Sequence, residues 1–598
     1  MNNEKYSGMG AILGPEGVTF RVWAPNAEKV FVFGSFNEWN DSSCEMEHEG
    51  NGYWSFHASD ASEGTEYKFI IHNNGNVLHR NDPYALKMTN SVGNSVVYDL
   101  WKDFNDHEFR PPAINEMVIY ELHIGTFNRE GREDGQVGDF YTAAKKLDYI
   151  RDLGVNTVEI MPVAEFPGDL SWGYNPSNPF AVETSYGGPD ALKHFVFEAH
   201  MRGIAVILDV VYNHLGPTDL NLWQYDGWEE NGKGGIYFYN DHRAKTPWGD
   251  TRPDYGRPEV RNYLRDNALL WLEAFQCDGL RFDATAIIRL LNVDDQMGGA
   301  VLEEGVGFLR SLNQEIKEKF PHKILIAEDL KFDSSVTADL DQGGLGFDSQ
   351  WGIGFSHVLR EVLTISNDHD RSINAVENLL LSKFNNDVFE KVIYTESHDE
   401  VANIESKRLP EEIQPGDAEG EYAKKKSTLG ALVIFTAPGI PMIFQGQEFL
   451  TYEHFHDSKP LDWGRLEYFG GIVNLYRDLI HLRKASEGFA RGLNGQGIDI
   501  LHHDDQGLVL AYARYHHDDP DNPVVIVVNF SVETKLGYRF GVHHGGNWNV
   551  IFNSGWSGYD QVFSEVDVKE VHSGEGLNGK QHSLVVDIPS YGGLILSR

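Results

Sequence analysis

Gly279-Leu-Arg-Phe-Asp-Ala284 is a short apolar run that closes with a carboxylate, and the chain repeats this pattern twice more. The second run is Ile324-Leu-Ile-Ala-Glu-Asp329, and the third ends in Glu396-Ser-His-Asp-Glu400. The first two runs are too apolar to have one side in water, which indicates parallel strands covered on both faces. Three carboxylates are therefore expected at the ends of three strands of one α/β region: Asp283, Glu328 and Asp399.

Apolar residues with helical spacing separate these runs. Leu192, Phe195, Val196 and Ala199 fall at positions i, i+3, i+4 and i+7, and similar spacing follows Pro258. Strands that alternate with helices indicate βα units, and eight such units close into a barrel. The predicted fold class is α/β, a (β/α)8 TIM barrel, with strands that begin near residues 118, 157, 204, 279, 324, 347, 391 and 441.

The two ends of the chain show a different pattern. Short alternating runs broken by turn residues occupy 18–23, 30–33 and 67–71, and β-type runs return at 508–512 and 524–529. Strands at this spacing are typical of β-sandwiches. We therefore predict three domains: an N-terminal β-sandwich over 1–108, the catalytic barrel over 109–486 and a C-terminal β-sandwich domain over 487–598.

Residues 212–258 form a polar stretch rich in glycine and aromatic residues. It is too long for an ordinary βα loop, so it predicts an insertion that forms a small subdomain over the barrel mouth. Its aromatic residues either form the core of that subdomain or provide flat surfaces for sugars. They are Trp223, Trp228, Tyr237, Tyr239 and Trp248.

Composition limits the possible partners and the compartment. The 598 residues include 90 acidic and 50 basic side chains, and a formal charge of −40 opposes binding to nucleic acid or to an anionic membrane. A neutral polysaccharide is indifferent to this charge. Cys44 and Cys277 alone cannot make a disulfide framework, and the chain has neither a signal-peptide pattern nor an apolar run of membrane-spanning length. We expect a soluble, cytoplasmic protein with no membrane and no nucleic-acid partner.

The carboxylates suggest a glycosyl-transfer site. Cleavage with retention needs one ionised carboxylate to attack the anomeric carbon and one carboxylic acid to protonate the leaving oxygen. Arg281 and Asp283 are two residues apart on one strand, so they point to the same side, and the guanidinium can keep Asp283 ionised. Asp283 is therefore the expected nucleophile, and Glu328 is the expected acid.

Other polar residues at strand ends are expected to bind sugar. Asp399 and His398 could hold hydroxyl groups, and the charge of Asp399 would also stabilise an oxocarbenium-like transition state. Asp209 and His214, at the end of the third strand, would add further hydroxyl contacts. Asp329 points to the opposite face of its strand, so it is the weaker acid candidate.

Four segments in this order resemble the signature segments of the α-amylase family of glycosidases and transglycosylases. They are Asp209-Val-Val-Tyr-Asn-His214, Gly279-Leu-Arg-Phe-Asp283, Ala327-Glu328 and Ser397-His-Asp399. The resemblance implies that Asp283 is the nucleophile, Glu328 the general acid/base and Asp399 the transition-state stabiliser. It also implies substrate-binding roles for Asp209, His214, Arg281 and His398, and for Tyr174 within Trp172-Gly-Tyr-Asn-Pro176.

The resemblance extends beyond the barrel. Phe20-Arg-Val-Trp-Ala-Pro25 and Gly34-Ser-Phe-Asn-Glu-Trp39 are similar to the N-terminal glycogen-binding-type sandwich of branching enzymes, isoamylases and trehalohydrolases. Glu396-Ser-His-Asp-Glu-Val401 and Gly446-Gln-Glu-Phe449 are similar to glucan branching enzymes, whereas Thr246-Pro-Trp-Gly249 is closer to trehalohydrolases and amylases. Transfer to a second glucan, making α-1,6 branches, and hydrolysis therefore both stay open.

The sequence also predicts the partner and the absence of a cofactor or metal, and it leaves one non-catalytic alternative. The partner is an α-glucan such as amylose, glycogen or a malto-oligosaccharide. No cofactor and no metal are predicted, because Asn213 is not accompanied by the run of acidic oxygens that calcium prefers. A glucan-binding protein on a catalytically dead barrel is a third hypothesis, and the retention of Arg281 together with the three carboxylates argues against it.

Overall fold

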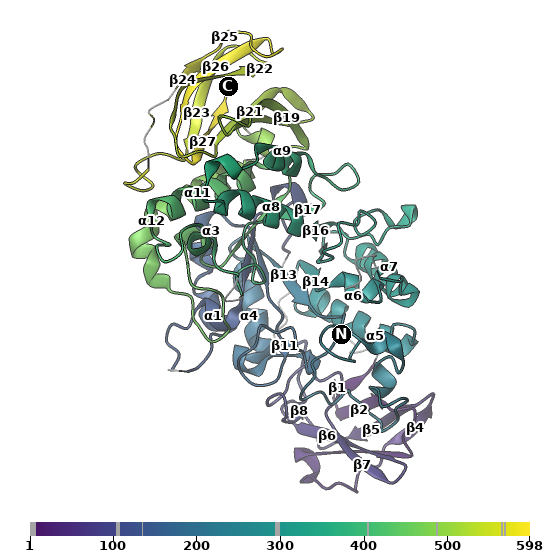
Figure 1. The fold of residues 1–598 in the computed structure, drawn as a ribbon. Coiled ribbons are helices and arrows are strands. Elements are labelled where there is room, and N and C mark those ends of the chain that lie inside the picture. Colours follow the sequence, from purple (N-terminus) through teal and green to yellow (C-terminus); the bar gives the residue numbers. More distant parts are fainter. Residues whose placement is uncertain are drawn as a thin grey trace.

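A computed structural model describes residues 8–102, 108–133, 135–292, 299–402, 406–485, 488–563, 566 and 570–598. The N-terminal and C-terminal strands lie at opposite ends of a central barrel (Figure 1). Within the described residues, the structure contains no helix with the length and apolar character needed to cross a membrane.

Eight parallel strands form the closed barrel, as predicted. The weakly marked sixth strand, expected at 347–351, is present as a short strand of three residues. Neighbouring strands are paired so that Asp209 lies beside Arg281. In chain order the barrel strands are β9 Ile119–Leu122, β10 Thr157–Ile160, β13 Ala205–Val210, β14 Gly279–Phe282, β15 Ile324–Ala327, β16 Ser349–Trp351, β17 Lys391–Ile393 and β18 Ile440–Phe444.

Helices cover the barrel, and their buried faces match the predicted spacing. Leu192, Phe195, Val196 and Ala199 are all buried on one helix. The helix predicted after Pro258 begins at that residue and continues beyond Leu269 as a π-helical turn. The helices are α1 Ile124–Phe127, α2 Phe140–Ala144, α3 Leu147–Leu153, α4 Gly188–His200, α5 Pro258–Leu269, α6 Thr285–Arg289, α7 Glu303–Lys319, α8 Ile353–Thr364, α9 Ile373–Leu381, α10 Leu409–Ile413, α11 Glu421–Thr436 and α12 Leu466–Lys484.

The N-terminal unit contains two antiparallel sheets, with strand orders β1-β2-β5-β4 and β3-β6-β7. Trp23 and Trp54 are buried in its core, whereas Trp39 is 37% exposed. Trp23 and Trp54 are thus core residues of this unit. The strands are β1 Gly10–Gly14, β2 Gly17–Trp23, β3 Lys29–Gly34, β4 Glu47–Gly50, β5 Tyr53–Ala58, β6 Glu66–Asn73, β7 Asn76–Arg80 and β8 Ser95–Val96.

The C-terminal unit also has two sheets, with strand orders β19-β20-β21-β27-β23-β24 and β22-β26-β25. The proposed domain boundary at 486 and 487 lies outside the described residues, as do residues 1–7 and 103–107 of the proposed first domain. The strands are β19 Gly497–Asp504, β20 Val509–His516, β21 Asp519–Asn529, β22 Lys535–Val542, β23 Asn547–Asn553, β24 Glu570–His572, β25 Gly574–Glu575, β26 His582–Ile588 and β27 Gly592–Ser597.

The 212–258 insertion contacts the N-terminal unit. Asp226 is fully buried, and its Oδ2 atom accepts hydrogen bonds from the backbone N and the side-chain Nδ2 of Asn26, both at 2.9 Å. Arg80 donates to the carbonyl oxygens of Tyr225 and Gln224. The insertion therefore links the N-terminal β-strands to the barrel.

Candidate active site

The predicted polar residues converge at the carboxyl ends of the barrel strands. Asp209 lies in β13 and Arg281 in β14, while Asp283 follows β14 and Glu328 follows β15. All four side chains are buried or nearly so. Asp399 lies on the loop after β17, and its side chain is 59% exposed. The mouth of the barrel therefore combines enclosed carboxyl groups with one that faces solvent.

Arg281 occupies the centre of this group. Its Nη1 atom donates to Asp209 Oδ2 at 2.7 Å and to Asp283 Oδ1 at 3.0 Å. Its guanidinium carbon lies 4.2 Å from the centre of the Trp351 ring. Arg281 thus fixes the orientation of Asp283, the predicted nucleophile.

Asn213 fixes the other oxygen of Asp283. Its Nδ2 atom donates to Asp283 Oδ2 at 2.6 Å and to the backbone oxygen of the same residue at 2.9 Å. Sequence reasoning considered Asn213 only as a weak calcium ligand and missed this contact. The sequence feature that could have indicated this contact is the position of Asn213 in the segment Asp209-Val-Val-Tyr-Asn-His214. The amide of Asn213 faces the carboxylate as a donor.

Glu328 has a different environment. Its Oε2 atom accepts a hydrogen bond from the backbone N of Ala284 at 2.7 Å. Ala284 has a φ of 40°, a left-handed conformation that is strained for a residue with a side chain. Burial raises the pKa of Glu328 to about 8; Arg281 opposes this rise, while Asp283 and Asp399 add to it. Glu328 therefore retains its proton at neutral pH, as a general acid requires.

His398 lies against an aromatic residue and is held by a carboxylate. The Tyr174 ring stacks on the imidazole with centroids 5.0 Å apart. His398 Nε2 lies 3.4 Å from Asp399 Oδ1, and Nδ1 is hydrogen-bonded to Glu121. Sequence reasoning missed Glu121, because a single acidic residue inside the first apolar strand carried no distinctive pattern.

Tyr174 connects this side of the site to Asp209. Its hydroxyl donates to Asp209 Oδ2 at 2.6 Å, the same oxygen that accepts from Arg281. Burial raises the pKa of Asp209 to about 7, against the opposing effect of Arg281. Tyr174 was expected to stack on a sugar, and the structure shows one of its faces directed to His398.

His214 and Trp248 form an aromatic pair at the edge of the site. Their rings stack with centroids 4.3 Å apart and planes inclined by 18°. Trp248 remains 48% exposed, whereas Tyr237 and Tyr239 are buried. Of the aromatic residues of the insertion, Trp248 is therefore the one that the structure presents to solvent beside a predicted sugar-binding residue.

Two nearby candidates have structural partners. His123 is hydrogen-bonded to the hydroxyl of Tyr186 and to the backbone oxygen of Ser171, and burial lowers its pKa to about 4. Asp329 makes a two-point ion pair with Arg289 at 2.8 and 2.6 Å. These contacts account for the positions of His123 and Asp329 without a role in the reaction.

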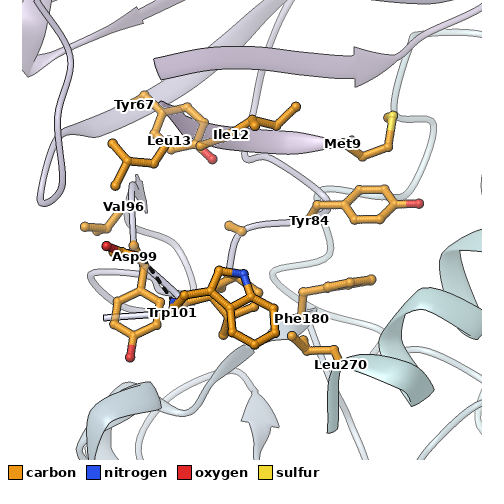
Figure 2. Close-up of a pocket in the computed structure, with 15 residues that line it drawn as sticks. Met9, Ile12, Leu13, Tyr67, Tyr84, Val96, Asp99, Trp101, Phe180 and Leu270 are labelled. Atoms are coloured by element: carbon orange, nitrogen blue, oxygen red, sulfur yellow. Dashed lines mark hydrogen bonds between the residues drawn. The ribbon is translucent and has the colours of Figure 1, made fainter. Parts of the chain in front are cut away.

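Figure 2 shows an apolar cavity outside the predicted site. It lies between the N-terminal strands and the barrel, with a volume of about 80 Å³, and Leu13, Tyr84, Trp101, Phe180 and Leu270 are among its lining residues. Its described lining includes none of the predicted site residues. The cavity belongs to the domain junction.

Possible metal ligands come together outside the predicted site. Among the residues that the structure describes, only His516, His517 and Asp518 bring three possible ligand atoms together, at the end of β20 and in the turn before β21. Asp209, Asp283 and Glu328 instead surround the Arg281 cation. A positive side chain at the centre of these carboxyl groups disfavours a second cation there.

Three protein-family models match most of the chain. Residues 8–85 match carbohydrate-binding module 48, the isoamylase N-terminal domain. Residues 125–224 and 217–463 match the alpha amylase catalytic domain, and residues 500–598 match the alpha amylase C-terminal all-beta domain.

Similar proteins and structures agree with this assignment. The 1,4-alpha-glucan branching enzyme GlgB of Oceanobacillus iheyensis is 33% identical over 575 residues, which cover 90% of this chain and 86% of the relative. The corresponding protein of Rhodospirillum rubrum is 32% identical, with 98% and 80% coverage. The structure of pullulanase from Bacillus acidopullulyticus covers 100% of this chain and 76% of its own, with a TM-score of 0.76 and 21% identity, a likeness in fold.

Proposed function

Because the chain belongs to the α-amylase family, we propose that it is a 1,4-α-glucan branching enzyme that works by double displacement. The observation that carries the chemistry is the arrangement of Asp283 and Glu328 around one guanidinium, with Glu328 kept neutral by burial. The choice of branching over other reactions of the family is supported by relatives of that activity along 90% or more of the chain.

In the first step, Asp283 attacks the anomeric carbon of an α-1,4-linked glucosyl unit. Glu328 donates its proton to the leaving 4-oxygen as the glycosidic bond breaks, so that a covalent glycosyl ester forms on Asp283. Arg281 and Asn213 hold the two oxygens of Asp283 before the attack. The nucleophile is therefore already oriented in the folded protein, and the reaction does not have to supply that free energy.

In the second step, Glu328 acts as a base. It takes the proton from the 6-hydroxyl of an acceptor glucan, and the oxygen attacks the anomeric carbon while the ester bond to Asp283 breaks. The product is an α-1,6 branch with retained configuration. Both carboxyl groups return to their starting protonation states, so no other reactant is needed.

The surrounding polar residues would bind and polarise the sugar. The exposed carboxylate of Asp399 would stabilise the positive charge of the oxocarbenium-like transition state. His398, Asp209, Tyr174 and His214 would contact hydroxyl groups or the sugar face. This assignment rests on their position around the carboxyl pair.

The proposed partner is an α-glucan, and the N-terminal unit would help to hold it. The proposed domain limits remain 1–108, 109–486 and 487–598. A cytoplasmic location is proposed because Cys44 and Cys277 are both free and buried.

One experiment tests this function. The purified protein is incubated with amylose, and α-1,6 linkages and reducing ends are counted in the same samples. A branching enzyme raises the number of α-1,6 linkages without a matching rise in reducing ends, and Asp283→Asn abolishes the change. Reducing ends without branches would overturn the proposal in favour of a hydrolase, and release of trehalose from malto-oligosyltrehalose would identify a trehalohydrolase.

A further inference from the structure

Glu121, in strand β9, holds one of the sugar-binding residues by two contacts. One carboxylate oxygen is hydrogen-bonded to His398 Nδ1, and the other accepts from the backbone N of His398 at 3.1 Å. Both side chains are almost completely buried. A single carboxylate therefore fixes the ring and the backbone of a residue on the loop after β17, with β18 between the two strands in the barrel.

The hydrogen bond at Nδ1 determines what the opposite nitrogen can do. An ionised carboxylate only accepts, so Nδ1 carries a proton. The other nitrogen, Nε2, lies 3.4 Å from Asp399 Oδ1, which also accepts. An imidazole between two carboxylates is most stable with protons on both nitrogens, as a cation. His398 then presents an N–H at Nε2 to the side of the site where Asp399 lies.

We propose that Glu121 is a positioning residue for glucan turnover: it keeps His398 doubly protonated and oriented so that Nε2–H donates to a substrate hydroxyl beside Asp399. The inference rests on the proposed function only in that His398 contacts the glucan. Glu121 itself touches His398 and no reacting atom.

The electrostatic surroundings of His398 agree with this role. Burial lowers its pKa, but Asp399 and Glu121 raise it by more, to about 9. Arg281 opposes them from β14. Other titratable groups that interact with His398 are His123 after β9, Glu159 on β10 and Asp209 on β13.

Glu159 provides a matched control. It lies directly beside Glu121 in the strand register, and it is also fully buried in the barrel. Burial raises its pKa well above the usual value, which favours its neutral form. Glu159→Gln therefore makes the same chemical change one strand away without removing a charge from His398.

The test compares the pH dependence of kcat/KM on amylose for Glu121→Gln, Glu121→Asp and Glu159→Gln. Removing the charge of Glu121 lowers the pKa of His398, so its cation is lost at lower pH. The wild-type limb follows Glu328, with a pKa of about 8, because the pKa of His398 is higher, at about 9. In Glu121→Gln the lowered pKa of His398 should make the alkaline limb steeper and move it to lower pH, and KM should rise about 10-fold. For Glu121→Asp, kcat/KM should be lower but should fall at the same alkaline pH as in the wild type. For Glu159→Gln, kcat/KM should also fall at the same alkaline pH as in the wild type.

A double mutant checks that the effect passes through His398. If it does, adding Glu121→Gln to His398→Asn should cost much less than it costs in the wild type. A folded Glu121→Gln variant with wild-type KM and pH limb would overturn the inference, as would fully additive effects. If Glu121→Gln does not fold, wild-type constants for Glu121→Asp would overturn it, and a lower kcat/KM with an unchanged limb would support it.

Failure of the proposed function gives a different result. A wild-type protein that hydrolyses amylose without branching would overturn that function, and the Glu121 variants would then be compared on hydrolysis.

Discussion

The Nη2 atom of Arg281 lies 3.2 Å from Oε2 of Glu328, yet the two atoms are not aligned as a hydrogen bond. Oε2 instead accepts from the backbone N of Ala284. Arg281 therefore attracts the charged form of Glu328 at short range but gives it no aligned donor, and burial prevails in setting the protonation of the acid. The same guanidinium donates directly to Asp283. Arg281 thus makes a hydrogen bond with Asp283 but only an unaligned ion pair with Glu328.

Replacing Arg281 with lysine should impair turnover strongly. A lysine ammonium is a compact point charge, so it cannot both donate to Asp209 and Asp283 as Nη1 does and lie flat against the Trp351 ring. We expect kcat to fall about 10²- to 10³-fold, the range found when one preorganised donor is removed from an active site. Steady-state kinetics on amylose measure the change, and chemical denaturation of the variant separates it from unfolding. A kcat within twofold of the wild type would contradict the role given to Arg281.

The raised pKa of Glu328 predicts the alkaline limit of activity. The acid must be protonated to donate to the leaving oxygen, and its pKa is about 8. Activity should therefore be retained through neutral pH and lost as the pH rises through about 8.

A glucosyl fluoride needs no proton donor for its leaving group, so Glu328→Gln should still form the glycosyl ester from it.

Mass spectrometry of the intact protein detects that ester, which should be absent when Asp283→Asn is added. An alkaline limit unchanged in the residual turnover of Glu328→Gln on amylose would assign the limit to another group.

The exposed tryptophan of the insertion should affect binding more than folding. Trp248 stacks on His214 and remains 48% exposed, so Trp248→Ala removes an aromatic face at the site edge. A lost aromatic contact costs about 0.5 to 1.5 kcal/mol, which corresponds to a rise in KM of roughly 2- to 12-fold. Trp556→Ala is the control, because Trp556 is 50% exposed in the C-terminal unit. Equal KM values for the two variants would remove Trp248 from the substrate site.

The sequence predicted the barrel and its carboxyl groups because both depend on local patterns. Apolar runs that end in Asp283 and Glu328 mark the strands and place these residues at the same end of the barrel. Even the three-residue strand at Trp351 follows from the need to close eight βα units.

The contacts that tune the site could not be predicted in this way. Glu121 and His398 are 277 residues apart, and their pairing depends on the barrel closing between β9 and β18. The left-handed backbone of Ala284 has no sequence signal, because a glycine would be the usual choice there. The exposure of Trp248 likewise depends on how the insertion packs.

The contact between the insertion and the N-terminal unit should contribute to stability. Asp226 is fully buried and accepts from the backbone N and Nδ2 of Asn26 and from the backbone N of Trp228. Asp226→Ala removes three hydrogen bonds to a buried carboxyl group, and a hydrogen bond contributes about 0.5 to 1.5 kcal/mol. We expect unfolding free energy to fall by at least about 2 kcal/mol in urea denaturation. Asp219→Asn is the control, because Asp219 accepts a hydrogen bond across the same junction, from Ser91 Oγ at 3.1 Å, and asparagine tolerates its φ of 54°. Equal stability of the two variants would show that Asp226 does not anchor the junction.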